Sequence, residues 1–157
     1  MDLGRLLRDE LVRHRLAAGD KWQAIRELVD VLMAGHEINL AQRPAIVEAV
    51  LERERSMTTG VGDGVAIPHG AVDNVDHFSA ALGVSDTGID FEALDGGRVH
   101  IVVLLIVPRR SFGRHVRTLA SVARLMNRDD LRTAIRDAED ASSVVGIIRA
   151  ADAAASN

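Results

Sequence analysis

The sequence predicts an α/β fold in which a β-sheet lies between helical layers. Two observations favour it: segments with helical spacing of apolar residues come before and after a central group of strand-like segments, and 47% of the 157 residues are apolar, enough for a core. No repeat, low-complexity tract or linker rich in proline and serine divides the chain. We therefore expect one domain over residues 1–152 and a frayed tail of small and polar side chains at 153–157.

Two helices are predicted in the N-terminal third of the chain. Asp20 and Gln23 have the spacing of a capping box, and the helical apolar pattern behind them ends at Gly35. A second helix is expected to begin near Pro44, because proline suits the first turn of a helix. Its apolar stripe consists of Ile46, Val47, Val50 and Leu51.

Strands and turns are predicted after Ser56. Glycines alternate over 60–64 and indicate a loop, which leads into a short strand at 65–67. Apolar and small residues alternate over 78–84, which predicts another strand. The nearly continuous apolar run over 99–107 is typical of a strand covered on both faces.

Helical spacing returns in the C-terminal third. Apolar and small residues between Gly113 and Met126 share one side of a predicted helix, and two shorter helices are expected around 131–135 and 144–148. Helices therefore precede and follow the predicted strands along the chain, as is typical of the α/β class.

Composition disfavours several classes of function. The formal net charge of −4 argues against a general binder of nucleic-acid backbones, and 3% aromatic residues with no tyrosine argue against a base-stacking platform. The sequence has no cysteine, so disulfides, thiolate zinc sites and catalytic thiols are excluded. The longest apolar run, Ile101–Pro108, is far shorter than the ~20 residues that span a bilayer, and the N-terminus lacks a secretory-signal pattern. We expect a soluble, cytoplasmic protein.

His69 has the setting most suited to function among the six histidines. A strand is expected to end at Ile67, Pro68 restricts the backbone, and Gly70 permits an unusual turn directly afterwards. This would place the imidazole at the exit of a strand, held stiffly and reachable from outside, as is common for binding and catalytic groups. An inert turn histidine is the alternative, and local sequence alone favours it.

Neither a metal site nor a nucleotide loop is indicated. The histidines lack metal-site spacing, and the glycine loop at 60–64 has no Gly-Lys-Ser/Thr and leads into a strand rather than a helix. We expect surface or structural roles for His14, His36, His77 and His100.

A specific motif begins at the end of the second predicted helix. Arg53-Glu54 is followed by the run TTGVGDGVAIPHG from Thr58 to Gly70. These residues resemble the signature of the mannitol/fructose-type enzyme IIA domains of the bacterial phosphotransferase system, a family with a nitrogen-regulatory branch. The resemblance continues through 88–91, 95–96, the strand ending at Pro108 and the helix containing His115, so it covers almost the whole chain. It implies a mixed β-sheet flanked by helices.

The resemblance implies roles for three side chains and requires no cofactor or metal. His69 would be the phosphorylated histidine, Arg53 would help to hold the phosphoryl group, and His115 would lie beside His69 as a hydrogen-bond partner. Without the resemblance, Arg53 is a solvated cation at a helix end, and His115 is either a packed helix residue or a hydrogen-bond donor near the first turn of its helix. Thr58 replaces the usual serine and Val116 the usual leucine, and neither change affects a reacting group.

Imidazole suits the chemistry of a phosphoryl carrier, because its ordinary pKa near 6.5 leaves it unprotonated at neutral pH. The resemblance names HPr or its nitrogen-branch relative as the phosphoryl donor and a IIB domain as the acceptor. Brief encounters with these partners predict a small interface, below ~1,200 Å². The alternative is a regulatory protein that controls its partners through its phosphorylation state. A metal-dependent hydrolase is disfavoured, because the sequence offers too few ligands.

Overall fold

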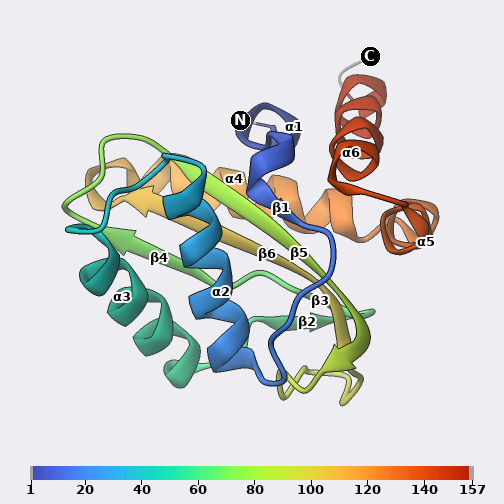
Figure 1. Cartoon of the computed structure of the whole chain (residues 1–157), viewed down its shortest axis with the longest axis horizontal. Helices are drawn as coiled ribbons and strands as arrows, with labels where there is room; N and C mark the ends of the chain where they lie inside the picture. Colours follow the sequence, from blue (N-terminus) through green and yellow to red (C-terminus); the bar gives the residue numbers. More distant parts are fainter. Residues whose placement is uncertain (1, 156–157) are drawn as a thin grey trace.

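A mixed β-sheet occupies the centre of the molecule, with helices on both of its faces (Figure 1). A computed structural model describes residues 2–155, with the side chain of Phe112 left out. The α-helices are α1 (Leu3–Leu6), α2 (Lys21–Ala34), α3 (Arg43–Ser56), α4 (Phe112–Met126), α5 (Asp129–Asp137) and α6 (Ala141–Ala155), with short 3-10 helices η1 (Asp9–Leu11) and η2 (Arg109–Ser111). Helices α2 and α3 lie in front of the sheet in Figure 1, and α4 passes behind it. The predicted fold class is therefore confirmed.

The strands are β1 (Val12–Arg13), β2 (Gly60–Gly62), β3 (Val65–Ala66), β4 (His69–Val72), β5 (Ser79–Ile89) and β6 (Val99–Pro108). They form one sheet in the order β1-β5-β6-β3-β2, and β4 also pairs with β6. Strand β6 is antiparallel to β5 and parallel to β3 and β4, so the sheet is mixed. Every residue of β6 except His100 is buried, as its apolar run predicts.

The helix signals in the sequence are confirmed at residue level. The side chain of Asp20 accepts a hydrogen bond of 2.8 Å from the backbone N–H of Gln23, which caps the N-terminus of α2. Pro44 lies in the first turn of α3. None of the helices within residues 2–155 is both long and apolar enough to cross a membrane.

Several segments differ from the expectation. The predicted glycine loop contains a short strand, β2, which pairs antiparallel with β3. The predicted strand over 78–84 extends to Ile89, and the short helix predicted at 144–148 is the much longer α6. Helix α6 continues to Ala155, so residues 153–155 are helical rather than part of a frayed tail, while residues 156–157 of that tail lie outside the described residues.

The prediction of an unusual turn after His69 is wrong. His69 and Gly70 begin strand β4, opposite Leu105 and Ile106 of β6. Gly70 is needed for packing, because a Cβ atom at this position would lie 2.9 Å from Cγ2 of Val50 on α3. The absence of a side chain therefore lets α3 approach the strand that carries His69.

Candidate functional site

The imidazole of His69 is oriented by its own strand. Its Nδ1 atom lies 2.9 Å from the carbonyl oxygen of Ile67. A carbonyl oxygen can only accept, so Nδ1 carries the proton and donates it, and the lone pair of the neutral ring is on Nε2. The ring is half-buried at the start of β4, and this burial lowers the pKa of His69, as does the positive charge of Arg53.

His115 lies beside His69 although the two are far apart in sequence. It belongs to the N-terminal half of α4, behind the sheet, and only 7% of its surface is exposed. The centroids of the two imidazole rings are 5.2 Å apart, with an angle of 50° between the ring planes. Burial lowers the pKa of His115, and the charges of His69 and Arg53 lower it further.

Arg53 completes the group from the C-terminal turn of α3. Its Nη1 atom donates a hydrogen bond of 2.8 Å to the carbonyl oxygen of Met57, directly after the helix. Its charge lowers the pKa of both histidines. The structure therefore brings together the three side chains that the sequence singled out, each from a different element.

The other four histidines make local contacts away from this group or lie at a turn. A ring nitrogen of His14 lies 2.6 Å from the carbonyl oxygen of Ala138, and one of His100 lies 2.9 Å from that of Ser85. His77 contacts the carboxylate of Glu37 at 2.9 Å. His36 has a positive φ of 64°, just after α2.

A buried ion pair beside Arg53 was not anticipated from the sequence. Glu54 is 2% exposed and Lys21 5% exposed, and Nζ of Lys21 lies 3.5 Å from Oε2 of Glu54. The same carboxylate accepts hydrogen bonds from the backbone N–H and the hydroxyl of Thr59. Lys21 also lies 3.4 Å from a carboxylate oxygen of Glu92 and 3.5 Å from the carbonyl oxygen of Phe91.

This network ties α2, the end of α3 and Thr59, the residue before β2, together next to Arg53. A buried charge is costly unless it is paired and hydrogen-bonded, and Glu54 meets both conditions. The only signal in the sequence was the adjacency of Glu54 to Arg53 in the motif. Nothing in the sequence indicated that Lys21 pairs with Glu54, because the two residues are 33 positions apart and local pattern does not reveal such contacts.

The arrangement favours reaction at one nitrogen. An unprotonated Nε2 is a nucleophile, and the neighbouring imidazole and guanidinium can stabilise negative charge on a group bound to it. Among residues 2–155, no group of three His, Asp or Glu side chains is placed to hold a metal ion. The groups described beside the imidazole of His69 are the imidazole of His115 and the guanidinium of Arg53.

Comparisons with known proteins agree over nearly the whole chain. The family model described as "Phosphoenolpyruvate-dependent sugar phosphotransferase system, EIIA 2" matches residues 5–151. A nitrogen regulatory protein of Bradyrhizobium diazoefficiens is 32% identical over 148 residues, which are 94% of this chain and 95% of that protein. A fructose-specific EIIABC component of Bacillus subtilis is 31% identical over 152 residues, or 97% of this chain, and this chain spans 24% of its length.

A solved structure gives the same result for the fold. The crystal structure of the nitrogen regulatory protein IIA-Ntr from Neisseria meningitidis matches with a TM-score of 0.83 and 26% identity, covering 93% of this chain and 98% of that one. The mixed α/β architecture and the sequence motif therefore lead to one assignment. The chain belongs to the EIIA 2 family of the phosphoenolpyruvate-dependent sugar phosphotransferase system.

Proposed function

We propose that this chain is a histidine phosphocarrier, which accepts a phosphoryl group from phospho-HPr, or from the nitrogen-branch relative of HPr, on Nε2 of His69. It then passes the group to a IIB domain or holds it as a regulatory signal. The hydrogen bond from Nδ1 to the carbonyl oxygen of Ile67 carries this proposal, because it leaves the lone pair on Nε2. Membership of the EIIA 2 family supports a phosphocarrier or regulatory role.

In the proposed step, the Nε2 lone pair of His69 attacks phosphorus while the bond from phosphorus to the donor breaks, and the electron pair of that bond returns to the donor. The proton on Nδ1 stays in its hydrogen bond to Ile67. Phosphoryl transfer passes through a loose transition state with charge on the phosphoryl oxygens, so positioning and countercharge supply most of the catalysis. We assign the countercharge to Arg53 and a hydrogen bond to a phosphoryl oxygen to His115.

The lowered pKa of His69 supports the role of acceptor. A protonated imidazole has no lone pair on Nε2 and cannot attack phosphorus. Because burial and the charge of Arg53 lower the pKa, the ring stays neutral at and somewhat below neutral pH. The fold thus keeps the proposed nucleophile in its reactive form.

Exposed apolar side chains next to the site support docking of protein partners. Met57, whose carbonyl oxygen accepts from Arg53, is 64% exposed, and Val116, next to His115, is 51% exposed. Covering such side chains on docking would exclude water from the transferring group. The small, brief interface expected from the sequence is consistent with this patch, and the family works with phosphoryl donors and IIB domains.

A regulatory role is the second candidate. The nitrogen regulatory protein of Bradyrhizobium diazoefficiens is 32% identical and aligns over 95% of its own length, which supports a regulatory role, while a fructose-specific EIIA component aligns over 94% of its own length and supports the first candidate. Both candidates use phosphate on His69 and belong to the cytoplasm. In the transport role the phosphate moves from His69 to a IIB domain, whereas in the regulatory role it stays on His69 and changes the binding of partner proteins.

The test is incubation with phosphoenolpyruvate, enzyme I and HPr, followed by mapping of acid-labile phosphate. We expect one phosphate on Nε2 of His69 in the wild-type chain and none in the His69→Ala variant. His77→Ala is the matched control, because His77 is an exposed histidine paired with Glu37, and it should be labelled normally. Labelling of His69→Ala at the wild-type level would overturn the proposal. Addition of a IIB domain then distinguishes transport from regulation by whether the label moves.

A further inference from the structure

The segment from Arg98 to Arg128 carries a strong local positive charge. It contains seven arginines and no aspartate or glutamate, although the whole chain has a formal net charge of −4. Carboxylates from flanking segments neutralise part of this charge. The ion pairs are Arg109 with Asp73 at 3.1 Å, Arg110 with Asp76 at 3.7 Å and Arg128 with Asp130 at 2.9 Å.

Arg114 and Arg117 differ from these paired arginines. Both are exposed on α4, and no carboxylate within residues 2–155 forms an ion pair with either guanidinium. They are three residues apart, so their Cβ atoms lie about 5–6 Å from each other on the same side of the helix. Two uncompensated cations at this spacing repel each other, and a bound anion would remove the repulsion.

A cavity lies next to these two arginines. It has a volume of about 250 Å³ and is lined by Phe78, Arg114, Arg117 and Thr118. Neither His69 nor His115 is among the lining residues. Phe78 directly precedes β5, which pairs with one edge of β6, whereas the strand of His69 pairs with the other edge. The cavity therefore does not include either imidazole, although Arg114 and Thr118 lie within one turn of His115 on α4.

We propose that this cavity binds the dianionic phosphate of a phosphate monoester. Guanidinium groups match phosphate oxygens in geometry and charge, and two of them can share one dianion. The hydroxyl of Thr118 adds a donor, and the ring of Phe78 offers an apolar wall for the carbon part of the ester. The volume suits an ester with only a few carbon atoms.

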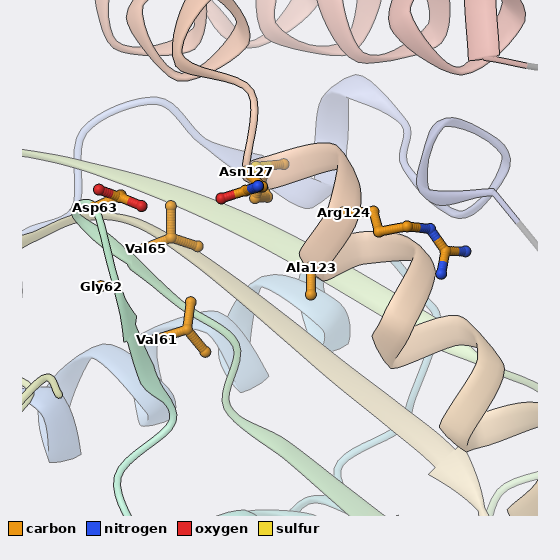
Figure 2. A pocket seen from close by; sticks show the side chains of 8 residues that line it. Val61, Gly62, Asp63, Val65, Ala123, Arg124 and Asn127 are labelled. Atoms are coloured by element: carbon orange, nitrogen blue, oxygen red, sulfur yellow. The ribbon is translucent and has the colours of Figure 1, made fainter.

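A second cavity on the same helix lacks these properties. It lies between the β2–β3 hairpin and the C-terminal half of α4, with a volume of about 310 Å³ (Figure 2). Val61 and Val65 face Ala123 across it, and it contains the carboxylate of Asp63 and a single arginine, Arg124, whose guanidinium extends away from the hairpin. A carboxylate repels a phosphate, so this cavity is not the anion site.

The phosphate monoester could come from two sources: a free phosphorylated metabolite or a phosphorylated side chain of a partner protein. The arginines recognise the chemistry that the two share. The inference does not depend on phosphorylation of His69, so the two proposals stand or fall separately.

The test is residue-resolved NMR of the full chain at constant ionic strength. Glycerol 3-phosphate represents a free metabolite, a short phosphoserine peptide represents a protein side chain, and glycerol and the unphosphorylated peptide are their matched controls. We expect saturable shifts of the backbone amides of Phe78 and residues 114–118 with at least one phosphorylated probe. Saturation by glycerol 3-phosphate alone assigns a metabolite, and saturation by the peptide alone assigns a phosphoprotein.

The double variant Arg114→Gln/Arg117→Gln should bind the effective probe at least tenfold more weakly. Arg26→Gln removes an exposed arginine of α2, on the other face of the sheet, that pairs with no carboxylate in the described part of the chain, and this variant should bind the probe as the wild type does. Superimposable thermal melts show that the variants are folded. The inference is overturned if neither phosphorylated probe saturates, if the amides of His69 and Gly70 shift with the probe while that of Phe78 does not, or if the double variant binds normally.

Discussion

His69 and His115 form a pair of imidazoles whose pKa values are both lowered by burial and by the same guanidinium. Two neutral rings can lie 5.2 Å apart without repulsion, whereas two imidazolium ions would repel each other. The environment therefore favours a state in which one ring offers a lone pair and the other can donate a hydrogen bond. Arg53 contributes to this state through its charge, from a position fixed by its bond to Met57.

Arg53→Gln should raise the pKa of both histidines, because it removes a positive charge that disfavours imidazolium. With the higher pKa, protonation of His69 begins at higher pH, so the rate of phosphorylation should start to fall at higher pH than in the wild type. Titration of the histidine ring resonances by NMR measures the first effect, and a pH profile of labelling measures the second. Arg26→Gln is the control, and unchanged titration midpoints in Arg53→Gln would contradict the role of its charge.

The close approach of α3 to β4 decides where Arg53 and His69 lie relative to each other. Gly70 makes this approach possible, since a Cβ atom there would lie 2.9 Å from Cγ2 and 3.2 Å from the backbone nitrogen of Val50. The backbone nitrogen cannot rotate away as a side-chain atom can. The helix as a whole would have to move, and the end that carries Arg53 would move with it.

Gly70→Ala should therefore lower the free energy of unfolding by about 1–3 kcal/mol, the usual cost of overpacking. It should also slow labelling of His69, because α3 is displaced. Urea denaturation measures the first effect. Gly146→Ala on α6 is the matched control: its Cβ meets nothing within 4 Å, so an alanine there should stabilise the helix by up to about 1 kcal/mol. Equal stability of the two variants would refute the packing role of Gly70.

Local pattern predicted the long helices and strands well, missed the short elements α1, β1 and β4, and gave no information on long-range contacts. Helices α2 and α3 and strand β6 follow from capping, proline and apolar signals, which depend only on neighbours in sequence. The role of Gly70 was misjudged because both a turn and a close approach select glycine, and only the second involves a distant residue. The Lys21–Glu54 ion pair was not predicted, because its two residues are also distant in sequence. Local sequence singled out His69 among the histidines, whereas its proposed role and the selection of Arg53 and His115 came from the motif.

The two ends of the described chain are joined through α1 and α6, which lie side by side in Figure 1. The backbone N–H of Gly4 donates to Oδ2 of Asp152 at 2.6 Å. Arg149 donates to the carbonyl oxygens of Gly4 at 3.1 Å and Leu7 at 2.9 Å. A short helix such as α1 is not stable alone, so these bonds and the burial of Leu3 and Leu7 hold it in place.

Arg149→Met should loosen this junction without affecting the histidines. Loss of two hydrogen bonds from a charged donor should lower the free energy of unfolding by about 1–2 kcal/mol, and the amides of Gly4 and Leu7 should exchange with solvent faster. Hydrogen exchange followed by NMR measures this. Arg136→Met on α5 is the control, and labelling of His69 should be normal in both variants. Unaltered exchange at Gly4 and Leu7 would show that the junction does not need Arg149.

The strand that carries His69 is hydrogen-bonded along its length to β6, a central strand of the sheet. If His69 is phosphorylated as proposed, the accepting atom lies on a paired strand rather than on a loop, so loading and delivery need not wait for a loop to reorder. For a carrier of the proposed kind, the overall rate of transfer then depends on how fast a phosphorylated partner associates and how fast the dephosphorylated partner dissociates. Selection for speed would then act on the outer surface of the molecule and leave its interior unchanged.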